Sequence, residues 1–282
     1  MPLALILSSH VASSRVGGFV QALALSQLKV DPLLVPTVMF GRHPGWGAPG
    51  GDPVGVGTFR GMLDGIEANG LFGVVDLVIT GYFANGAQVR AAGMAIDKIR
   101  AAERAGGYAR RPRIVVDPVM GDDEKGLYVN AEVAETMASE LVPRADLVTP
   151  NAWEMQRLTG TPIRDARAAR AAGRVLAKPV LVSSVRHGGD MAVVYADGPE
   201  AWVAAHPRQA KAPNGAGDLL TALFAAALVE DQPISYALAR AVGAVFETVV
   251  AAEAWAASEL PVVAMGPRLR QASAQVRIER LI

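Results

Sequence analysis

Residues 74–118 contain a strand, a helix and a second strand in succession. The stretch begins with VVDLVIT (74–80), a short run of β-branched and apolar residues, and ends with a similar run, RIVVDP (113–118). Between them, QVRAAGMAIDKIRAAERA (88–105) spaces its apolar residues three and four positions apart, as an amphipathic helix does. This order predicts two parallel strands with the helix packed against them.

The same alternation runs through most of the chain. Further strands are predicted at 3–8, 33–38, 146–150 and 179–184, with an edge hairpin formed by 192–197 and 201–206. Further helices are predicted at 17–29, 57–69, 131–142, 218–229 and 234–257. We therefore expect an α/β fold, a three-layer α/β/α sandwich with a mainly parallel central sheet. It would be a single domain over 1–282, with a polar C-terminal tail from about 265.

Composition excludes several functional classes. The 282 residues include no cysteine, which excludes disulfides, a thiolate nucleophile and a zinc-ribbon site. Positive and negative charges cancel at 27 each, so neither nucleic acid nor an anionic membrane is an expected partner. The N-terminal MPLALILSSH is interpreted as a first strand and not a signal peptide, and Glu247 and Glu253 make 241–257 a poor membrane span. A cytoplasmic enzyme is expected.

In an open parallel sheet, ligands bind beyond the carboxyl ends of the strands, so the residues there are the candidates for a site. The clearest segment is APNGAGDLLTALFAAAL (212–228). The amides of Gly215, Ala216 and Gly217 would lie at a helix start and attract an anion. Asp218 would then be the base that takes the proton of an alcohol attacking phosphorus, or simply the helix cap. This stretch alone leaves both interpretations open.

Three other strand ends carry polar groups, each with a structural alternative. In DPVMGD (117–122), the carboxylates of Asp117 and Asp122 would face one cation, Mg²⁺ or K⁺ bound with a nucleotide, or serve only as turn residues. In TPNAWE (149–154), Glu154 has capping-box spacing, or lies near a metal-bound water. In VSSVRHGG (182–189), the two serine hydroxyls would contact a phosphate, or form hydrogen bonds with backbone groups of a turn.

Several nucleotide and metal motifs are absent from the sequence. There is no GxxxxGK[ST] run, which excludes a P-loop kinase by motif. No glycine-rich fingerprint follows the first strand, which counts against a dinucleotide oxidoreductase. The four histidines show no ligand spacing, which counts against a histidine metal site.

The order of these segments resembles the ribokinase-like superfamily, and within it the pyridoxal kinase family. The resemblance covers residues from about 5 to about 257 and rests on segments that are specific in combination. These segments are SHV (9–11), VG (16–17), TGY (80–82), DPVMGD, YV (128–129), DLVTPN (146–151), the serine pair 183–184 and GAGD (215–218). The resemblance implies a ribokinase-like fold, usually a homodimer, that phosphorylates the 5′-hydroxymethyl group of pyridoxal and related vitamers with ATP.

The resemblance also implies roles for individual residues. Asp218 resembles the catalytic base, and the amides of 215–217 resemble the anion hole for the transferred phosphoryl group. The residues implied to organise Mg²⁺, a monovalent cation such as K⁺ and the ATP phosphates are Asp117, Asp122, Thr149 and Glu154. Ser183, Ser184 and Gly215 are implied nucleotide contacts. The implied substrate contacts are Ser9, Val16, His43, Tyr82 and Asp218.

The chain departs from the family on the substrate side. The segment 41–57, GRHPGWGAPGGDPVGVG, is too rich in Gly and Pro for regular structure, which predicts a disordered insertion or a flap. Around His43 it resembles the family's flap that closes over the substrate. Here Arg42, Pro44 and Trp46 stand where the family often has Asn, Thr and Tyr, and Gly18 stands where Asn is frequent. These changes affect the identity of the substrate more than phosphoryl transfer.

Two other kinds of protein remain as alternatives. A related kinase would act on hydroxymethylpyrimidine or a sugar, although the hydroxymethylpyrimidine branch commonly has a cysteine in the anion-hole turn and this chain has none. A B6-binding protein that has lost turnover is the third possibility, and the altered flap is compatible with it.

Overall fold

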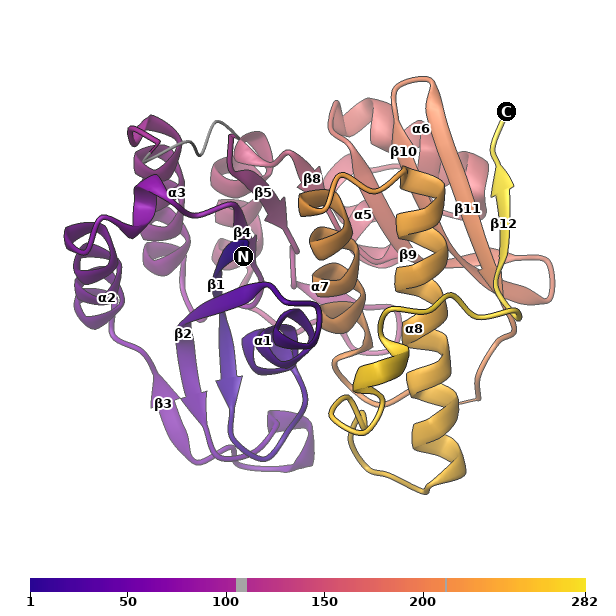
Figure 1. Ribbon diagram of the computed structural model, residues 1–282, viewed down its shortest axis with the longest axis horizontal. Coiled ribbons are helices and arrows are strands. Elements are labelled where there is room, and N and C mark those ends of the chain that lie inside the picture. The colour runs from indigo at the N-terminus through magenta and orange to yellow at the C-terminus, as the bar shows by residue number, and fades with distance from the viewer. Residues whose placement is uncertain (105–110, 211) are drawn as a thin grey trace.

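A computed structural model describes residues 1–104, 111–210 and 212–282 of the chain. In this part of the chain, ten strands form one sheet with the order β12-β11-β10-β9-β8-β5-β4-β1-β2-β3 (Figure 1). The strands are β1 (Leu3–Val11), β2 (Asp31–Phe40), β3 (Gly51–Pro53), β4 (Leu77–Thr80), β5 (Arg113–Val116), β8 (Leu147–Val148), β9 (Val180–His187), β10 (Asp190–Asp197), β11 (Glu200–His206) and β12 (Arg277–Arg280). A separate small sheet pairs β6 (Gly121–Asp122) with β7 (Gly126–Leu127).

The central strands of the large sheet are parallel, as predicted. Strands β2, β1, β4, β5, β8 and β9 pair with one another in parallel, in that spatial order. Antiparallel pairing is confined to β3 at one edge and to β10, β11 and β12 at the other. The carboxyl ends of the parallel strands therefore meet along one edge of the molecule.

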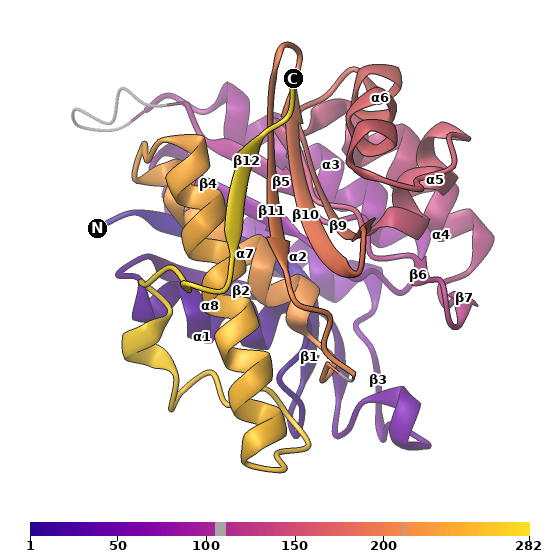
Figure 2. The same cartoon turned by 90° about the vertical axis from the view of Figure 1, so that its right-hand side faces the viewer.

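Helices cover both faces of the sheet, which confirms the three-layer α/β/α sandwich (Figures 1 and 2). One layer contains α1 (Gly17–Gln27), α7 (Ala216–Val229) and α8 (Ile234–Ala254). The other contains α2 (Val56–Ala68), α3 (Gly86–Ala101), α4 (Ala131–Thr136), α5 (Ala152–Thr159) and α6 (Ala166–Leu176). Side chains alternate between the layers along β1: Leu5 and Leu7 pack on the α2–α6 side, and Ala4 and Ile6 on the α1, α7 and α8 side.

Helix α8 is long and apolar enough to cross a membrane by length and composition alone. However, 56% of its most apolar window is buried inside the protein, where it packs against α7 and β11. These are the properties of a core helix.

Some predicted boundaries were wrong for identifiable reasons. The helix predicted over 88–105 spans Gly86–Ala101, and position 105 lies outside the described residues. The helix predicted over 131–142 becomes α4, a π-helical turn (Met137–Leu141) and a 3₁₀ turn (Val142–Arg144), because Pro143 cannot continue α-helical hydrogen bonding. Helix α6 was not predicted, because its buried positions are the small residues Ala and Gly and not large apolar residues, although Arg167 and Arg174 are exposed on its other face.

The glycine-rich segment 41–57 and the C-terminal tail from 265 both contain regular structure that was not predicted. Within 41–57 there is a 3₁₀ turn (Pro44–Trp46), and β3 pairs with β2. The loop is closed where the N–H of Gly41 donates to the carbonyl oxygen of Gly50, with N···O 2.9 Å. The tail from 265 contains a 3₁₀ turn (Gly266–Arg268) and β12, which pairs outside β11, so the predicted hairpin 192–206 is not the edge of the sheet.

Candidate active site

The first turn of α7 is formed by a glycine turn that leaves its backbone amides unpaired within the helix. Gly215 is the N-cap, with φ 91° and ψ 0°, and a Cβ added to it would lie 2.0 Å from the carbonyl oxygen of Arg15. Only glycine satisfies both the left-handed backbone and this close approach. No side chain in the described structure caps α7. The N–H groups of this turn and the helix dipole together favour a bound anion.

Asp218 does not cap this helix, so the capping interpretation of this residue was wrong. It lies in the first turn of α7, and its Oδ2 accepts a hydrogen bond from the backbone N–H of Gly17, at 2.9 Å. Desolvation by the surrounding protein raises the pKa of Asp218 to about 6, although the Gly17 hydrogen bond acts in the opposite direction. Its carboxylate therefore has a proton affinity suited to a base near neutral pH.

Asp117 follows β5 and is joined to α7 through a threonine. It is 5% exposed, and its Oδ2 accepts a hydrogen bond from Oγ1 of Thr221 at 3.0 Å. Because the Thr221 hydroxyl hydrogen is used there, Thr149, whose Oγ1 lies 2.9 Å away, is the donor in the second bond. Burial, together with the charges of Asp218 and Glu154, raises the pKa of Asp117 well above its usual value.

Glu154 is buried in the first turn of α5 and forms the predicted capping box with Asn151. The N–H of Glu154 donates to Asn151 Oδ1 and the N–H of Asn151 donates to Glu154 Oε2, both at 2.9 Å. Its Oε1 also accepts from the N–H of Met120 at 2.9 Å, which attaches the loop after β5 to α5. Burial raises the pKa of Glu154 to about 7 against the opposing effect of these N–H donors. With both oxygens occupied, Glu154 is suited to reach a cation through water.

Asp122 lies at the turn between β6 and β7. Its Oδ1 accepts hydrogen bonds from the N–H groups of Glu124 and Lys125, at 3.0 and 2.7 Å. Asp122 therefore stabilises this turn, as one of its two interpretations predicted. Its half-buried side chain also lines the cavity described below.

Ser183 and Ser184 form a β-bulge in β9. Val182 pairs with Val194 and Val185 with Ala192, so two residues of β9 face one residue of β10. Ser184 has a left-handed φ of 58°, which is uncommon for a residue other than glycine. The bulge turns this end of β9 toward the loop after β8, where Ser183 donates its N–H to the carbonyl oxygen of Pro150 at 3.0 Å.

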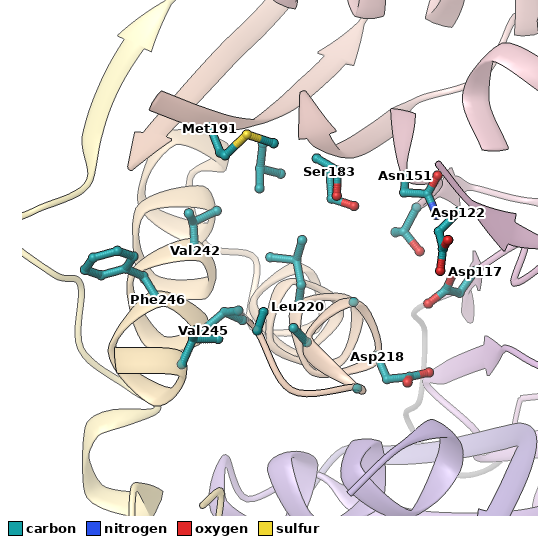
Figure 3. A pocket seen from close by; sticks show the side chains of 18 of the residues that line it. Asp117, Asp122, Asn151, Ser183, Met191, Asp218, Leu220, Val242, Val245 and Phe246 are labelled. Carbon is teal, nitrogen blue, oxygen red and sulfur yellow. The ribbon is translucent and has the colours of Figure 1, made fainter. Parts of the chain in front are cut away.

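These residues line one cavity of about 390 Å³. Every residue predicted for catalysis, ATP or metal lines it: Asp117, Asp122, Thr149, Glu154, Ser183, Ser184, Gly215, Ala216, Gly217 and Asp218. Figure 3 shows the carboxylates of Asp117, Asp122 and Asp218 at one end and the apolar side chains of Met191, Val242 and Phe246 at the other. The cavity thus joins an acidic end to an apolar end.

Sequence reasoning missed the apolar end of the cavity. The missed lining residues are Val119, Tyr128, Asn151, Met191, Val193, His206, Gln209, Ala212, Leu220, Val242, Val245, Phe246 and Val249. Most are apolar residues at strand or helix spacing, which cannot be distinguished from core residues without the fold. Asn151 was identified only as a helix cap.

Apart from Asp218, the residues predicted for substrate contact lie outside this cavity's lining. Ser9 is buried near the end of β1, and a Cβ on Gly17 would lie 2.0 Å from its Oγ. Val16 is the N-cap of α1, next to the Gly17 that binds Asp218. His43 caps the 3₁₀ turn of the flap, accepting from the N–H of Gly45 at 3.1 Å, and burial lowers its pKa. Tyr82 follows β4, where burial raises the pKa of its phenol.

The acidic end fits a cation that is shared with a ligand. Asp117 and Glu154 are both buried carboxylates, and no Lys or Arg belongs to the cavity lining within the described residues. Over the same part of the chain, no three acidic or histidine side chains form a complete metal site. Mg²⁺ is commonly held by one or two carboxylates together with water and substrate phosphates, which is the donor set present here.

The chain is similar to known proteins over most of its length. The model of the phosphomethylpyrimidine kinase family matches residues 87–262. Pyridoxal kinase PdxY of Corynebacterium diphtheriae is 30% identical over 253 residues, which is 87% of either chain. The Leifsonia xyli enzyme of the same name is 33% identical over 254 residues, covering 86% of this chain and 87% of the relative. The solved pyridoxal kinase of Leishmania donovani with ADP and ginkgotoxin has a TM-score of 0.91 at 25% identity, with 100% of both chains covered.

Proposed function

Because the chain belongs to the pyridoxal kinase family of the ribokinase-like superfamily, we propose that it transfers the γ-phosphoryl group of ATP to the 5′-hydroxymethyl group of pyridoxal. The observation that supports this most is the half-buried Asp218 beside the unpaired amides at the start of α7. A base and an anion site on one helical turn are the two groups that phosphoryl transfer to an alcohol requires.

The nucleotide lies along the cavity with its phosphates at the acidic end and its base at the apolar end. The amides of 215–217 then point at the transferred phosphoryl group and stabilise its oxygens. The apolar side chains of Met191, Val242 and Phe246 bury the base.

Asp218 accepts the proton of the substrate hydroxyl as its oxygen attacks phosphorus. The hydrogen bond from Gly17 holds the carboxylate in place through Oδ2. The flap at 41–57 closes over the vitamin and excludes water, which would otherwise accept the phosphoryl group.

Asp117 and Asp122, with Thr149 and with Glu154 through water, would hold Mg²⁺ and K⁺. Mg²⁺ supplies positive charge that neutralises the phosphates, and a monovalent cation adds to it. The absence of Lys and Arg from the described lining supports this assignment, because buried carboxylates and phosphates would otherwise repel one another.

A kinase for hydroxymethylpyrimidine is the second candidate. The match of residues 87–262 to the phosphomethylpyrimidine kinase family supports it. We favour pyridoxal over hydroxymethylpyrimidine as the substrate because the relatives named pyridoxal kinase match more of the chain than the phosphomethylpyrimidine kinase model does. Homodimer assembly and a cytoplasmic location stay predictions from the family.

ATP consumption by the purified protein tests the proposal. Pyridoxal, hydroxymethylpyrimidine and ribose are offered separately with Mg²⁺ and K⁺, and phosphorylated product is measured. Turnover on pyridoxal supports the proposal. Turnover on another alcohol alone moves the protein to a neighbouring branch, and tight pyridoxal binding without turnover identifies a binding protein.

A further inference from the structure

The apolar end of the cavity contains two polar side chains that share one backbone oxygen. Nδ1 of His206 lies 3.0 Å from the carbonyl oxygen of Pro207, and Nε2 of Gln209 donates to the same oxygen at 3.4 Å. His206 is the last residue of β11, and its ring packs against Phe246 of α8, with centroids 5.6 Å apart and planes inclined by 52°. His206, Gln209 and Phe246 all line the cavity.

The shared carbonyl determines which atoms of the two side chains remain available. A carbonyl oxygen only accepts hydrogen bonds, so Nδ1 of His206 carries the hydrogen, and Nε2 of the neutral ring is an acceptor. The amide nitrogen of Gln209 faces Pro207, which leaves its Oε1 as an acceptor. Across the described residues, neither Nε2 of His206 nor Oε1 of Gln209 has a hydrogen-bond partner.

We propose that His206 and Gln209 select the nucleotide by its exocyclic amino group, so that adenine is bound in preference to a 6-oxopurine. This inference rests on the proposed function, in which the apolar end holds the nucleotide base. The 6-amino group of adenine carries two N–H donors, which match the two acceptors. In hypoxanthine a carbonyl oxygen takes its place, and it would face two acceptors with no hydrogen to share.

The surrounding side chains cannot make this distinction by themselves. Met191, Val193, Val242 and Phe246 contact a base through its shape and apolar surface, which adenine and hypoxanthine share. A pocket of this kind discriminates poorly between near-isosteric ligands, whereas a pocket with positioned polar groups discriminates strongly. The two acceptors are therefore the features that separate the two bases.

Calorimetric binding of ADP and of IDP to the full chain tests the inference, with turnover of ATP and ITP measured in parallel. We expect IDP to bind about tenfold to a hundredfold more weakly than ADP, because the half-buried acceptors of His206 and Gln209 would be left unpaired. His206→Phe keeps an aromatic ring against Phe246 but removes the acceptor, and Gln209→Met removes Oε1 at similar size. In each variant the ADP-to-IDP preference should fall by about threefold or more.

His187→Phe is the matched control, since His187 ends β9 outside the cavity lining and its loss should leave the preference unchanged. Equal binding of ADP and IDP by the native chain would overturn the inference without any variant. A preference that persists in both variants would overturn it too. If both diphosphates bind but pyridoxal is never phosphorylated, the proposed function fails while the ADP-to-IDP ratio still decides this inference. If neither binds, the nucleotide site itself is wrong.

Discussion

The backbone N–H of Gly17, at the start of α1, donates a hydrogen bond of 2.9 Å to the Asp218 carboxylate in the first turn of α7. The two residues are 201 positions apart in the sequence. The bond orients the carboxylate through Oδ2 and favours its charged form, while Oδ1 has no hydrogen-bond partner in the described structure. One oxygen is thus positioned by the protein and the other is available to a substrate hydroxyl.

Replacement of Asp218 by Asn should strongly reduce turnover while substrate still binds. Asn keeps the shape and an oxygen for the Gly17 N–H but cannot accept the hydroxyl proton. We expect kcat to fall by about a hundredfold or more, with KM changed by less than about threefold. Steady-state kinetics with pyridoxal and ATP measure both, and Asp31→Asn, an exposed position at the start of β2, is the control. If kcat decreases by less than about tenfold, Asp218 is not the base.

Two glycines of the same turn should respond differently to alanine. At Gly215, a Cβ would lie 2.0 Å from the Arg15 carbonyl oxygen and φ is 91°, so Gly215→Ala should lower the free energy of unfolding by about 1–3 kcal/mol and reduce kcat. At Gly217, no atom lies within 4 Å of an added Cβ, so Gly217→Ala should be neutral or slightly stabilising. Urea unfolding compares the two. Equal effects would show that the contact with Arg15 is not the constraint.

Ser184 should be more stable as glycine, because its φ of 58° strains any residue with a Cβ. We expect Ser184→Gly to raise the free energy of unfolding by about 0.5–1 kcal/mol, and Ser184→Ala to leave it nearly unchanged. Both variants remove the hydroxyl, so both should raise KM for ATP by a similar factor if that hydroxyl contacts the nucleotide. A higher KM in only one variant would contradict the role of the hydroxyl.

The ligand-free protein should lose stability as pH rises from mildly acidic values through neutrality. The pKa values of Asp117, Glu154 and Asp218 are raised in the folded state, so the folded protein binds protons more tightly than the unfolded chain. This contribution is fully present below the ordinary carboxyl pKa and is lost as pH rises through about 6 to about 7. The free energy of unfolding should therefore be about 1–3 kcal/mol higher near pH 5.5 than near pH 8.

Glu154→Gln tests this pH dependence, because Gln preserves the capping box and removes the charge. Its stability should vary less between the two pH values than that of the native chain. Asp97→Asn is the control, since Arg144 lowers the pKa of Asp97 and its titration lies below the window. A native protein that is more stable at the higher pH would contradict the assigned direction.

Activity should have an acidic limb set by Asp218. The residue acts as a base only when ionised, and its pKa in the ligand-free protein is about 6. Cations bound nearby stabilise the carboxylate, so kcat/KM should fall as pH drops through about 6 or below. A pH–rate profile of the native chain measures this limb, and a limb centred well above pH 6 would point to another group.

The sequence by itself determined the fold class and most of the acidic end of the site. Alternating strand and helix periodicities predicted the parallel sheet, and the position of polar residues after the strands placed Asp117, Thr149 and Ser183 together. Asp218 was identified separately, from the glycine turn before it. This succeeded because the carboxyl ends of parallel strands must meet at one edge. Local patterns such as the capping box of Asn151 and Glu154 were equally readable, since both partners lie within one helical turn.

Only the tertiary structure decided which groups contact one another across long stretches of chain. The Gly17–Asp218 bond, the Thr221 bridge between Asp117 and Thr149, and the pairing of β12 outside β11 join segments whose local patterns carry no information about their partners. The apolar end of the cavity was also hidden, because Met191 and Phe246 have the periodicity of core residues. Whether such a residue packs in a core or faces a ligand depends on how closely two distant elements approach, and the three-dimensional packing alone sets that distance.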